Sequence, residues 1–104
     1  MSIEHLVLFR FAEAADAHEC VARLRAMAGR IPQVRGLRAG LNQVPSERAW
    51  DVGLVITLDS LDDLVAYREH PVHVPVMAWV RAHATTTGAA DFDPDAPVAA
   101  PAPS

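Results

Sequence analysis

The chain of 104 residues has a single cysteine, no lysine and no long apolar run, and each shortage argues against a class of protein. Cys20 alone cannot form an internal disulfide, which fits a reducing compartment, so we expect a cytoplasmic protein. No apolar segment approaches the roughly 20 residues that a membrane-spanning helix needs. The first residues, Met1 to His5, lack the basic segment of a secretory signal. We therefore expect no membrane partner.

Positive charge is also scarce. The formal net charge is −4, and the nine basic residues, all arginines, are scattered along the chain. Proteins that bind a phosphate backbone concentrate Lys and Arg on one face, so we expect no nucleic-acid partner. Gly-rich phosphate loops, Gly-x-Ser-x-Gly and Cys-x-x-Cys motifs are missing too, which predicts chemistry without a cofactor.

The residues that are present suit one globular domain. Half of the chain (51 %) is hydrophobic and 21 % is charged, and a chain of this length has room for a single core. Residues 93–104 contain four of the eight prolines and little that could pack. We expect a domain over residues 1–92 followed by a disordered Pro/Ala-rich tail over residues 93–104.

Period-two alternation of apolar residues predicts strands. Four segments show it, though the second is interrupted by glycines and the last is marked mainly by β-branched residues at its start: 3–11, 34–41, 50–58 and 85–92. On the first of these, Val7, Phe9 and Phe11 share one face with His5, and the other face is also largely apolar. This strand is therefore expected to be covered on both sides.

Helical spacing fills the intervals between the strands. A capping-box-like pair, Asp16 and Glu19, predicts the start of a first helix that Gly29 ends. Ser60 is expected to cap a second helix, which the dipeptide His70-Pro71 breaks. A further helical stretch is predicted over residues 72–84.

The resulting order, β-α-β-β-α-β, predicts a ferredoxin-like α+β unit with helices on one face of a four-stranded antiparallel sheet. The face without helices is expected to be too apolar for water, notably because of Val7, Phe9 and Phe11. A large exposed apolar face marks an interaction surface. Two such sheets paired face to face would form a homodimer that encloses a shared barrel.

Several short motifs occur in a characteristic order: His5 to Phe11, Ile31-Pro-Gln-Val34, Gly40-Leu-Asn42, Trp50-Asp51, Tyr67 to His73 (Tyr-Arg-Glu-His-Pro-Val-His) and Asp91-Phe92. Together they resemble the stress-responsive dimeric α/β-barrel (Dabb) family over residues 3–92. The resemblance implies a homodimer with a ligand cavity between each sheet and its helices. It does not imply one function.

The resemblance also suggests roles for individual residues. In one family member, plant olivetolic acid cyclase, a His and a Tyr act as the acid/base pair that closes a linear polyketide thioester by aldol condensation. By resemblance these correspond to His73 and Tyr67, and a first-strand histidine corresponds to His5. A tyrosine on the cyclase's first helix is replaced here by Leu24.

The chemistry of these residues supports the same candidates. A neutral imidazole such as that of His73 can remove a proton α to a carbonyl. The phenol of Tyr67 can orient that imidazole or donate to a developing enolate oxygen. His5 would add a second hydrogen-bonding group. The alternative for all three is a structural role, with each side chain packed or bonded to the backbone.

Apolar side chains on the predicted strands and helices are candidates for the walls of a ligand cavity, although core packing accounts for them equally well. They are Val7, Phe9, Leu24, Met27 and Trp79. His70, His73 and His83 lack a cysteine or carboxylate at ligand spacing, so we expect no metal site. Cys20 is expected to be a buried structural thiol.

These features predict a protein that binds a small carbonyl-bearing molecule and catalyses cofactor-independent acid/base chemistry, as a polyketide cyclase or a lyase-like enzyme. Two alternatives stay open. One is a cofactor-free monooxygenase of the antibiotic-biosynthesis type, in which the same histidine would generate a substrate carbanion that reacts with oxygen. The other is a stress-responsive binding module without catalysis.

Overall fold

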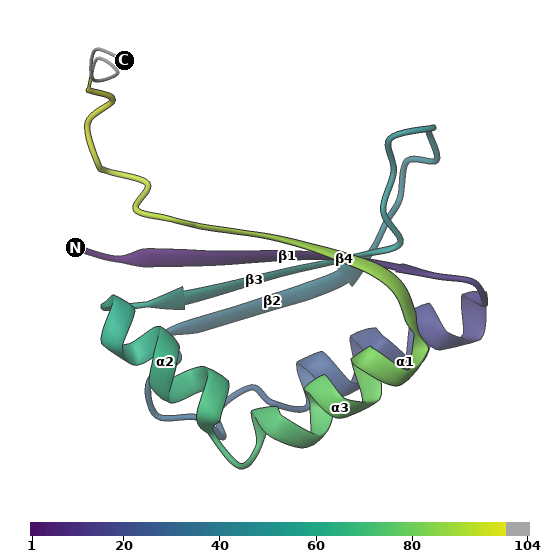
Figure 1. The fold of residues 1–104 in the computed structure, drawn as a ribbon, viewed down its shortest axis with the longest axis horizontal. Helices are drawn as coiled ribbons and strands as arrows, with labels where there is room; N and C mark the ends of the chain where they lie inside the picture. The colour runs from purple at the N-terminus through teal and green to yellow at the C-terminus, as the bar shows by residue number, and fades with distance from the viewer. Residues whose placement is uncertain (100–104) are drawn as a thin grey trace.

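A four-stranded antiparallel sheet in the order β2-β3-β1-β4 forms one layer of the structure, and three helices form the second layer against one of its faces (Figure 1). The computed structural model describes residues 1–99. Its elements are, in chain order, β1 (Ile3–Phe11), α1 (Ala14–Arg25), β2 (Gly36–Leu41), β3 (Val52–Leu58), α2 (Leu61–Glu69), α3 (His73–His83) and β4 (Ala84–Phe92). The predicted ferredoxin-like α+β fold is confirmed.

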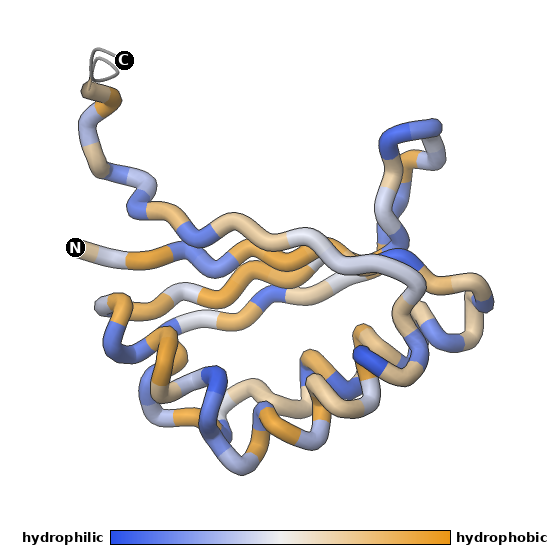
Figure 2. Tube along the Cα trace, viewed as in Figure 1, coloured by the Kyte–Doolittle hydropathy of each residue, from blue (hydrophilic) through white to orange (hydrophobic). Residues whose placement is uncertain are grey.

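The core lies between the sheet and the helices. The residues of β3 alternate between buried and half-buried along the whole strand, as expected for a strand with one face in the core. Antiparallel pairing sets His5 opposite Ile56 and Phe9 opposite Val52, so these β1 residues point to the same side as the buried residues of β3. Figure 2 shows the apolar residues gathered along the central strands and on the helices.

The residues predicted for the uncovered face of the sheet were wrong. Val7, Phe9 and Phe11 lie on the face that the helices cover, and Phe9 is 1 % exposed. Both faces of β1 are apolar, so alternation within that strand cannot tell which face the helices take. The register with β3 decides it. The uncovered face instead carries apolar residues from three strands and the loop before β3: Leu6, Leu8, Trp50, Val55, Ala90 and Phe92.

Helix α1 begins earlier than the predicted capping box. Its N-cap position is Glu13, whose side chain makes no capping hydrogen bond, and Asp16 lies inside the first turn. A carboxylate in the first turn is stabilised by the helix dipole, which explains why an acidic signal appears there without being the cap. The helix ends at Arg25, and a series of turns continues to Gly29, whose φ of 76° requires the freedom of glycine.

Helix α2 begins where the sequence predicts. The Oγ atom of Ser60 accepts a hydrogen bond of 3.1 Å from the backbone N–H of Asp63. The helix ends at Glu69, and His70 and Pro71 separate it from α3.

The strand ends differ from the predicted ones by one or two residues. β2 and β3 each begin two residues later, at Gly36 and Val52, and β4 begins at Ala84. After β4, residues 93–99 form a turn and irregular chain. The rest of the predicted disordered tail, residues 100–104, lies outside the described residues. Within residues 1–99 no helix combines the length and the apolar character needed to cross a bilayer.

Removal of the cap at Ser60 tests the local folding of α2. Ser60→Ala should lower the free energy of unfolding by about 1 kcal/mol, because the N–H of Asp63 loses its acceptor. Urea denaturation followed by circular dichroism measures the loss. Ser60→Asp, which keeps an acceptor, is the matched control and should stay close to wild type. Equal unfolding midpoints for all three proteins would contradict the capping role.

Candidate functional site

A cavity of about 480 Å³ lies between the covered face of the sheet and helices α2 and α3. β1 and the start of α3 supply its histidines, α2 supplies a tyrosine and an arginine, and β4 closes one side. It is lined by His5, Val7, Phe9, Leu24, Leu54, Tyr67, Arg68, His73, Val74, Met77, Arg81, Thr87, Gly88 and Ala89. The structure thus brings together the three predicted catalytic residues and three of the five predicted wall residues.

His5 is oriented by the last strand. Antiparallel pairing of β1 with β4 sets His5 opposite Asp91, and the His5 Nδ1 lies 2.5 Å from an Asp91 carboxylate oxygen. The other carboxylate oxygen lies 3.7 Å from an Arg68 guanidinium nitrogen. A carboxylate partner favours the proton on Nδ1, which leaves Nε2 as the nitrogen free to meet a ligand.

His73 owes its position to the break between α2 and α3. His70 and Pro71 interrupt the helix, and the Val72 N–H donates to His70 Nδ1 at 3.0 Å, which fixes the turn. His73 then starts α3, and its Nδ1–H donates to the Arg68 carbonyl oxygen at 2.9 Å. Because Nδ1 is occupied as a donor, the lone pair of the free base is on Nε2. The side chain lines the cavity and its residue is 7 % exposed.

Tyr67 lies between the two histidines. It is 1 % exposed, at the end of α2. Its ring centroid is 4.3 Å from that of His73 and 5.7 Å from that of His5. Within residues 1–99 its hydroxyl has no hydrogen-bond partner, so it is available to a molecule in the cavity. Three proton-carrying side chains therefore share one end of the cavity.

The protonation states of Tyr67 and His73 are complementary. Burial lowers the pKa of His73, and the positive charges of His5, Arg68 and Arg81 lower it further, while the bond to the Arg68 carbonyl works in the opposite direction. Burial also raises the pKa of the Tyr67 phenol. Near pH 7 the pair is a neutral imidazole that can accept a proton and a phenol that can donate a hydrogen bond.

Two of the predicted wall residues lie elsewhere. Met27 follows the end of α1 and is 2 % exposed in the core, outside the cavity lining. The Trp79 ring lies between the Arg23 guanidinium, 4.9 Å from its centroid, and the His83 ring at 4.3 Å. Trp79 is two residues beyond Met77, about 200° around the helix from the cavity side. Helical spacing marked both residues as apolar without distinguishing these directions.

Sequence reasoning missed several residues of the site, among them Arg68, Asp91 and Arg81. The sequence contained a signal for two of these charged residues. Asp91 stands on a strand whose other residues are mostly small or hydroxylated, and pairing with the first strand places it opposite His5. Arg81 is eight residues after His73 and shares its helix face.

Other reactive groups lie outside this cavity. Cys20 is fully buried, and burial raises the pKa of its thiol to about 11, so it remains a neutral thiol. His70 forms the turn before α3. Across residues 1–99 no three His, Cys, Asp or Glu side chains gather closely enough to hold a metal ion.

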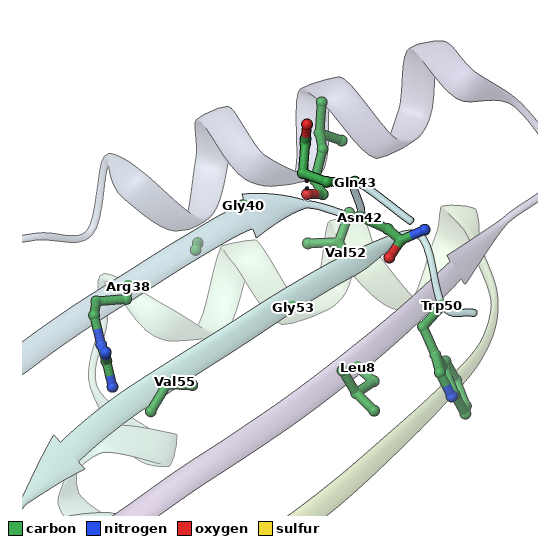
Figure 3. Close-up of a pocket in the computed structure, with 11 residues that line it drawn as sticks. Leu8, Arg38, Gly40, Asn42, Gln43, Trp50, Val52, Gly53 and Val55 are labelled. Carbon is green, nitrogen blue, oxygen red and sulfur yellow. Dashed lines mark hydrogen bonds between the residues drawn. The ribbon is translucent and has the colours of Figure 1, made fainter. Parts of the chain in front are cut away.

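A second hollow, of about 510 Å³, lies over the uncovered face of the sheet. Figure 3 shows its residues, with Leu8 on β1, Val55 on β3 and Trp50 at the strand ends. The Trp50 ring packs so close to Gly88 that a Cβ there would be 3.4 Å away. The Arg10 guanidinium lies 4.1 Å from the centre of the same ring. In the part of the chain that the structure describes, no histidine lines this hollow, which distinguishes it from the cavity under the helices.

The match to a family of known proteins covers nearly the whole domain. Residues 3–94 match the stress responsive A/B barrel domain, Dabb. The chain belongs to the Dabb family. The resemblance seen in the sequence motifs is thereby confirmed.

Three similar proteins place this Dabb chain among its relatives. An uncharacterised protein of Streptomyces coelicolor is 32 % identical over 88 residues, which cover 80 % of this chain and 91 % of the relative. A dimeric ferredoxin-like protein of unknown function from Thermobifida fusca has a TM-score of 0.79 at 24 % identity, covering 88 % of this chain and 90 % of the other. A hydroxynitrile lyase from Passiflora edulis has a TM-score of 0.76 at 13 % identity, covering 92 % and 97 %. These structural matches show the fold of the Dabb chain.

The lowered pKa of His73 has a consequence for stability. The unfolded chain takes up the proton first, at the ordinary pKa of 6.5. The stability contributed by neutral His73 is therefore complete above that pH and is lost as the pH falls toward the lower pKa of the folded protein, by at most about 1.4 kcal/mol per pH unit. NMR titration should give a His73 pKa below 6.5. In urea unfolding experiments, the free energy of unfolding of His73→Gln should fall less steeply with decreasing pH than that of wild type.

The exposed His18 provides the control. His18→Gln should leave the pH dependence of unfolding close to that of wild type, because this side chain lies outside the cavity. A His73 pKa at or above the ordinary histidine value would contradict the argument.

Proposed function

We propose that this protein is a cofactor-independent acid/base enzyme that acts on a carbonyl-bearing metabolite, in the manner of a polyketide cyclase or a lyase. The observation that carries the proposal is the group at one end of the cavity. His73 offers a neutral Nε2 there, Tyr67 an unpaired hydroxyl, and His5 an imidazole oriented by Asp91. A merely structural role would not require three such side chains to face one cavity.

The proposed reaction begins with proton transfer. Nε2 of His73 takes a proton from the carbon next to the substrate carbonyl, and the electron pair left on that carbon delocalises to form an enolate. The Tyr67 hydroxyl donates a hydrogen bond to the enolate oxygen, where negative charge develops. In a cyclisation the enolate carbon then attacks a second carbonyl of the same molecule, and the alkoxide that forms accepts a proton. A lyase step runs in the opposite direction: Nε2 of His73 takes the proton of a hydroxyl, the carbon–carbon bond breaks to leave an enolate, and the enolate carbon is protonated. The His73 imidazolium returns its proton at the end.

The surroundings support this chemistry. The rest of the cavity wall near His73 is largely apolar, with Val7, Phe9 and Leu54 from the sheet. An apolar wall excludes water, so hydrogen bonds to a developing charge are stronger than in solution. Asp91, which bonds to His5 and does not itself line the cavity, acts as a positioning residue.

Replacement of His73 tests the proposal. His73→Gln should lower kcat for a converted β-keto or polyketide-like compound by about 10²- to 10⁴-fold, the usual loss when a general base is removed. Mass spectrometry of reaction mixtures measures the conversion. Tyr67→Phe should also lower kcat, because the enolate loses its donor, and His18→Gln should match wild type.

Two outcomes would replace the proposal. Stoichiometric oxygen consumption during turnover would indicate the monooxygenase alternative. A ligand that binds to wild type and is never transformed, with only the loss of about one hydrogen bond (roughly 0.5–1.5 kcal/mol) in His73→Ala, would indicate a binding module.

We also propose that two copies of the chain pair through the uncovered faces of their sheets. That face carries Leu6, Leu8, Val55 and Trp50, which are half-buried in the single chain, and Phe92, which is 44 % exposed. Among residues 1–99, no helix covers it (Figure 1). Apolar surface of this kind is stabilised by burial against a partner, and the similar protein from Thermobifida fusca is a dimer.

A charge on this face should prevent pairing. Leu8→Asp places a carboxylate at the centre of the uncovered face and should convert the dimer to a monomer, measured by size-exclusion chromatography with light scattering. Val65→Asp is the matched control, because Val65 is 50 % exposed on α2, away from the sheet. A monomeric wild type, or a Leu8→Asp protein that remains dimeric, would contradict the pairing.

A further inference from the structure

The cavity is positively charged although the protein is acidic. The formal net charge of the chain is −4, yet the residues that line the cavity include two arginines and no aspartate or glutamate. One of them, Arg68, lies beside Asp91. The other, Arg81, differs from it in its neighbours.

Arg81 has no acidic partner within residues 1–99. Three other arginines do have one: Arg23 with Glu19 at 3.0 Å, Arg35 with Asp59 at 2.6 Å, and Arg68 with Asp91 at 3.7 Å. Arg81 is exposed and lines the cavity. A planar guanidinium with free donors on the wall of a cavity matches a carboxylate, which it binds through two parallel hydrogen bonds.

Helix α3 sets the distance between Arg81 and the end of the cavity that holds His73. His73, Met77 and Arg81 are four residues apart, so they share one face of α3 and all three line the cavity. Along the helix axis, residues 73 and 81 are about 12 Å apart. Side chains on a helix lean toward its N-terminus, so the guanidinium of Arg81 lies closer to His73 than this distance. Met77 makes the middle of this face apolar, and Val7 and Phe9 lie across from it on the sheet.

We propose that the cavity takes a carbonyl compound that carries a carboxylate, with the carboxylate on Arg81, an aliphatic chain along Met77 and the reacting carbonyl at His73. The position of the carbonyl rests on the proposed function, whereas the carboxylate site does not. His73 and Arg81 line the same cavity from one face of α3, so one molecule can reach both ends.

Binding of a matched pair of probes tests the carboxylate site. 5-Oxooctanoate and its primary amide have the same chain and carbonyl and differ in charge. By isothermal titration calorimetry, the wild-type protein should bind the acid at least about tenfold more tightly than the amide, because a charge-assisted bidentate pair is lost with the amide. Arg81→Gln should remove most of this preference and leave amide binding unchanged.

Arg30→Gln is the control for net charge. Arg30 is exposed and lines none of the three hollows found in residues 1–99, so this variant should keep the preference for the acid. Arg81→Lys retains a positive charge without the fork of donors and should fall between wild type and Arg81→Gln. Circular dichroism verifies that each variant is folded.

Several results would overturn the inference. They are equal affinity of wild type for acid and amide, an equal loss for both probes in Arg81→Gln, and no binding of the acid at millimolar concentration. The outcomes are independent of turnover. A carboxylate preference that depends on Arg81, with no compound ever converted, would uphold the site and refute the proposed catalysis; conversion without that preference would do the reverse.

Discussion

The site depends on the antiparallel pairing of the first and last strands. Backbone hydrogen bonds between β1 and β4 set His5 opposite Asp91, 86 residues later in the sequence, and the short imidazole–carboxylate contact follows from that register. A shift of β4 by one residue would turn Asp91 to the uncovered face of the sheet and away from His5. The same pairing also places β4 beside the cavity, where its small residues leave room for a ligand.

The break between α2 and α3 supplies the other half of the site. A continuous helix would have used the Arg68 carbonyl within its own backbone ladder. Its helical donor would be the Val72 N–H, which here donates to His70 Nδ1 after the break at Pro71, and the freed Arg68 carbonyl accepts the Nδ1–H of His73. One backbone interruption thus fixes the tautomer of the base and brings it to 4.3 Å, centroid to centroid, from the Tyr67 ring.

The sequence allowed most of the fold and part of the site to be predicted, for identifiable reasons. Period-two patterns and the cap at Ser60 are local signals, and they gave elements correct to within one or two residues at most ends. The covered face of β1 was assigned wrongly because both of its faces are apolar, and only pairing with β3 decides between them. Asp91 was missed because its contact with His5 depends on the register between two strands, which no local pattern contains. Arg81 was missed although its spacing from His73 on one helix was visible in the sequence.

The fold itself does not determine the chemistry, since a hydroxynitrile lyase shares it at 13 % identity. The chemistry depends instead on the side chains of the cavity, whose lining in residues 1–99 includes two arginines and no carboxylate. Burial and the nearby cations lower the pKa of His73, and the same cations attract an anionic molecule. Binding such a molecule would in turn partly neutralise Arg81 and make His73 a stronger base. Substrate recognition and activation of the base would therefore be two effects of one arrangement of charges.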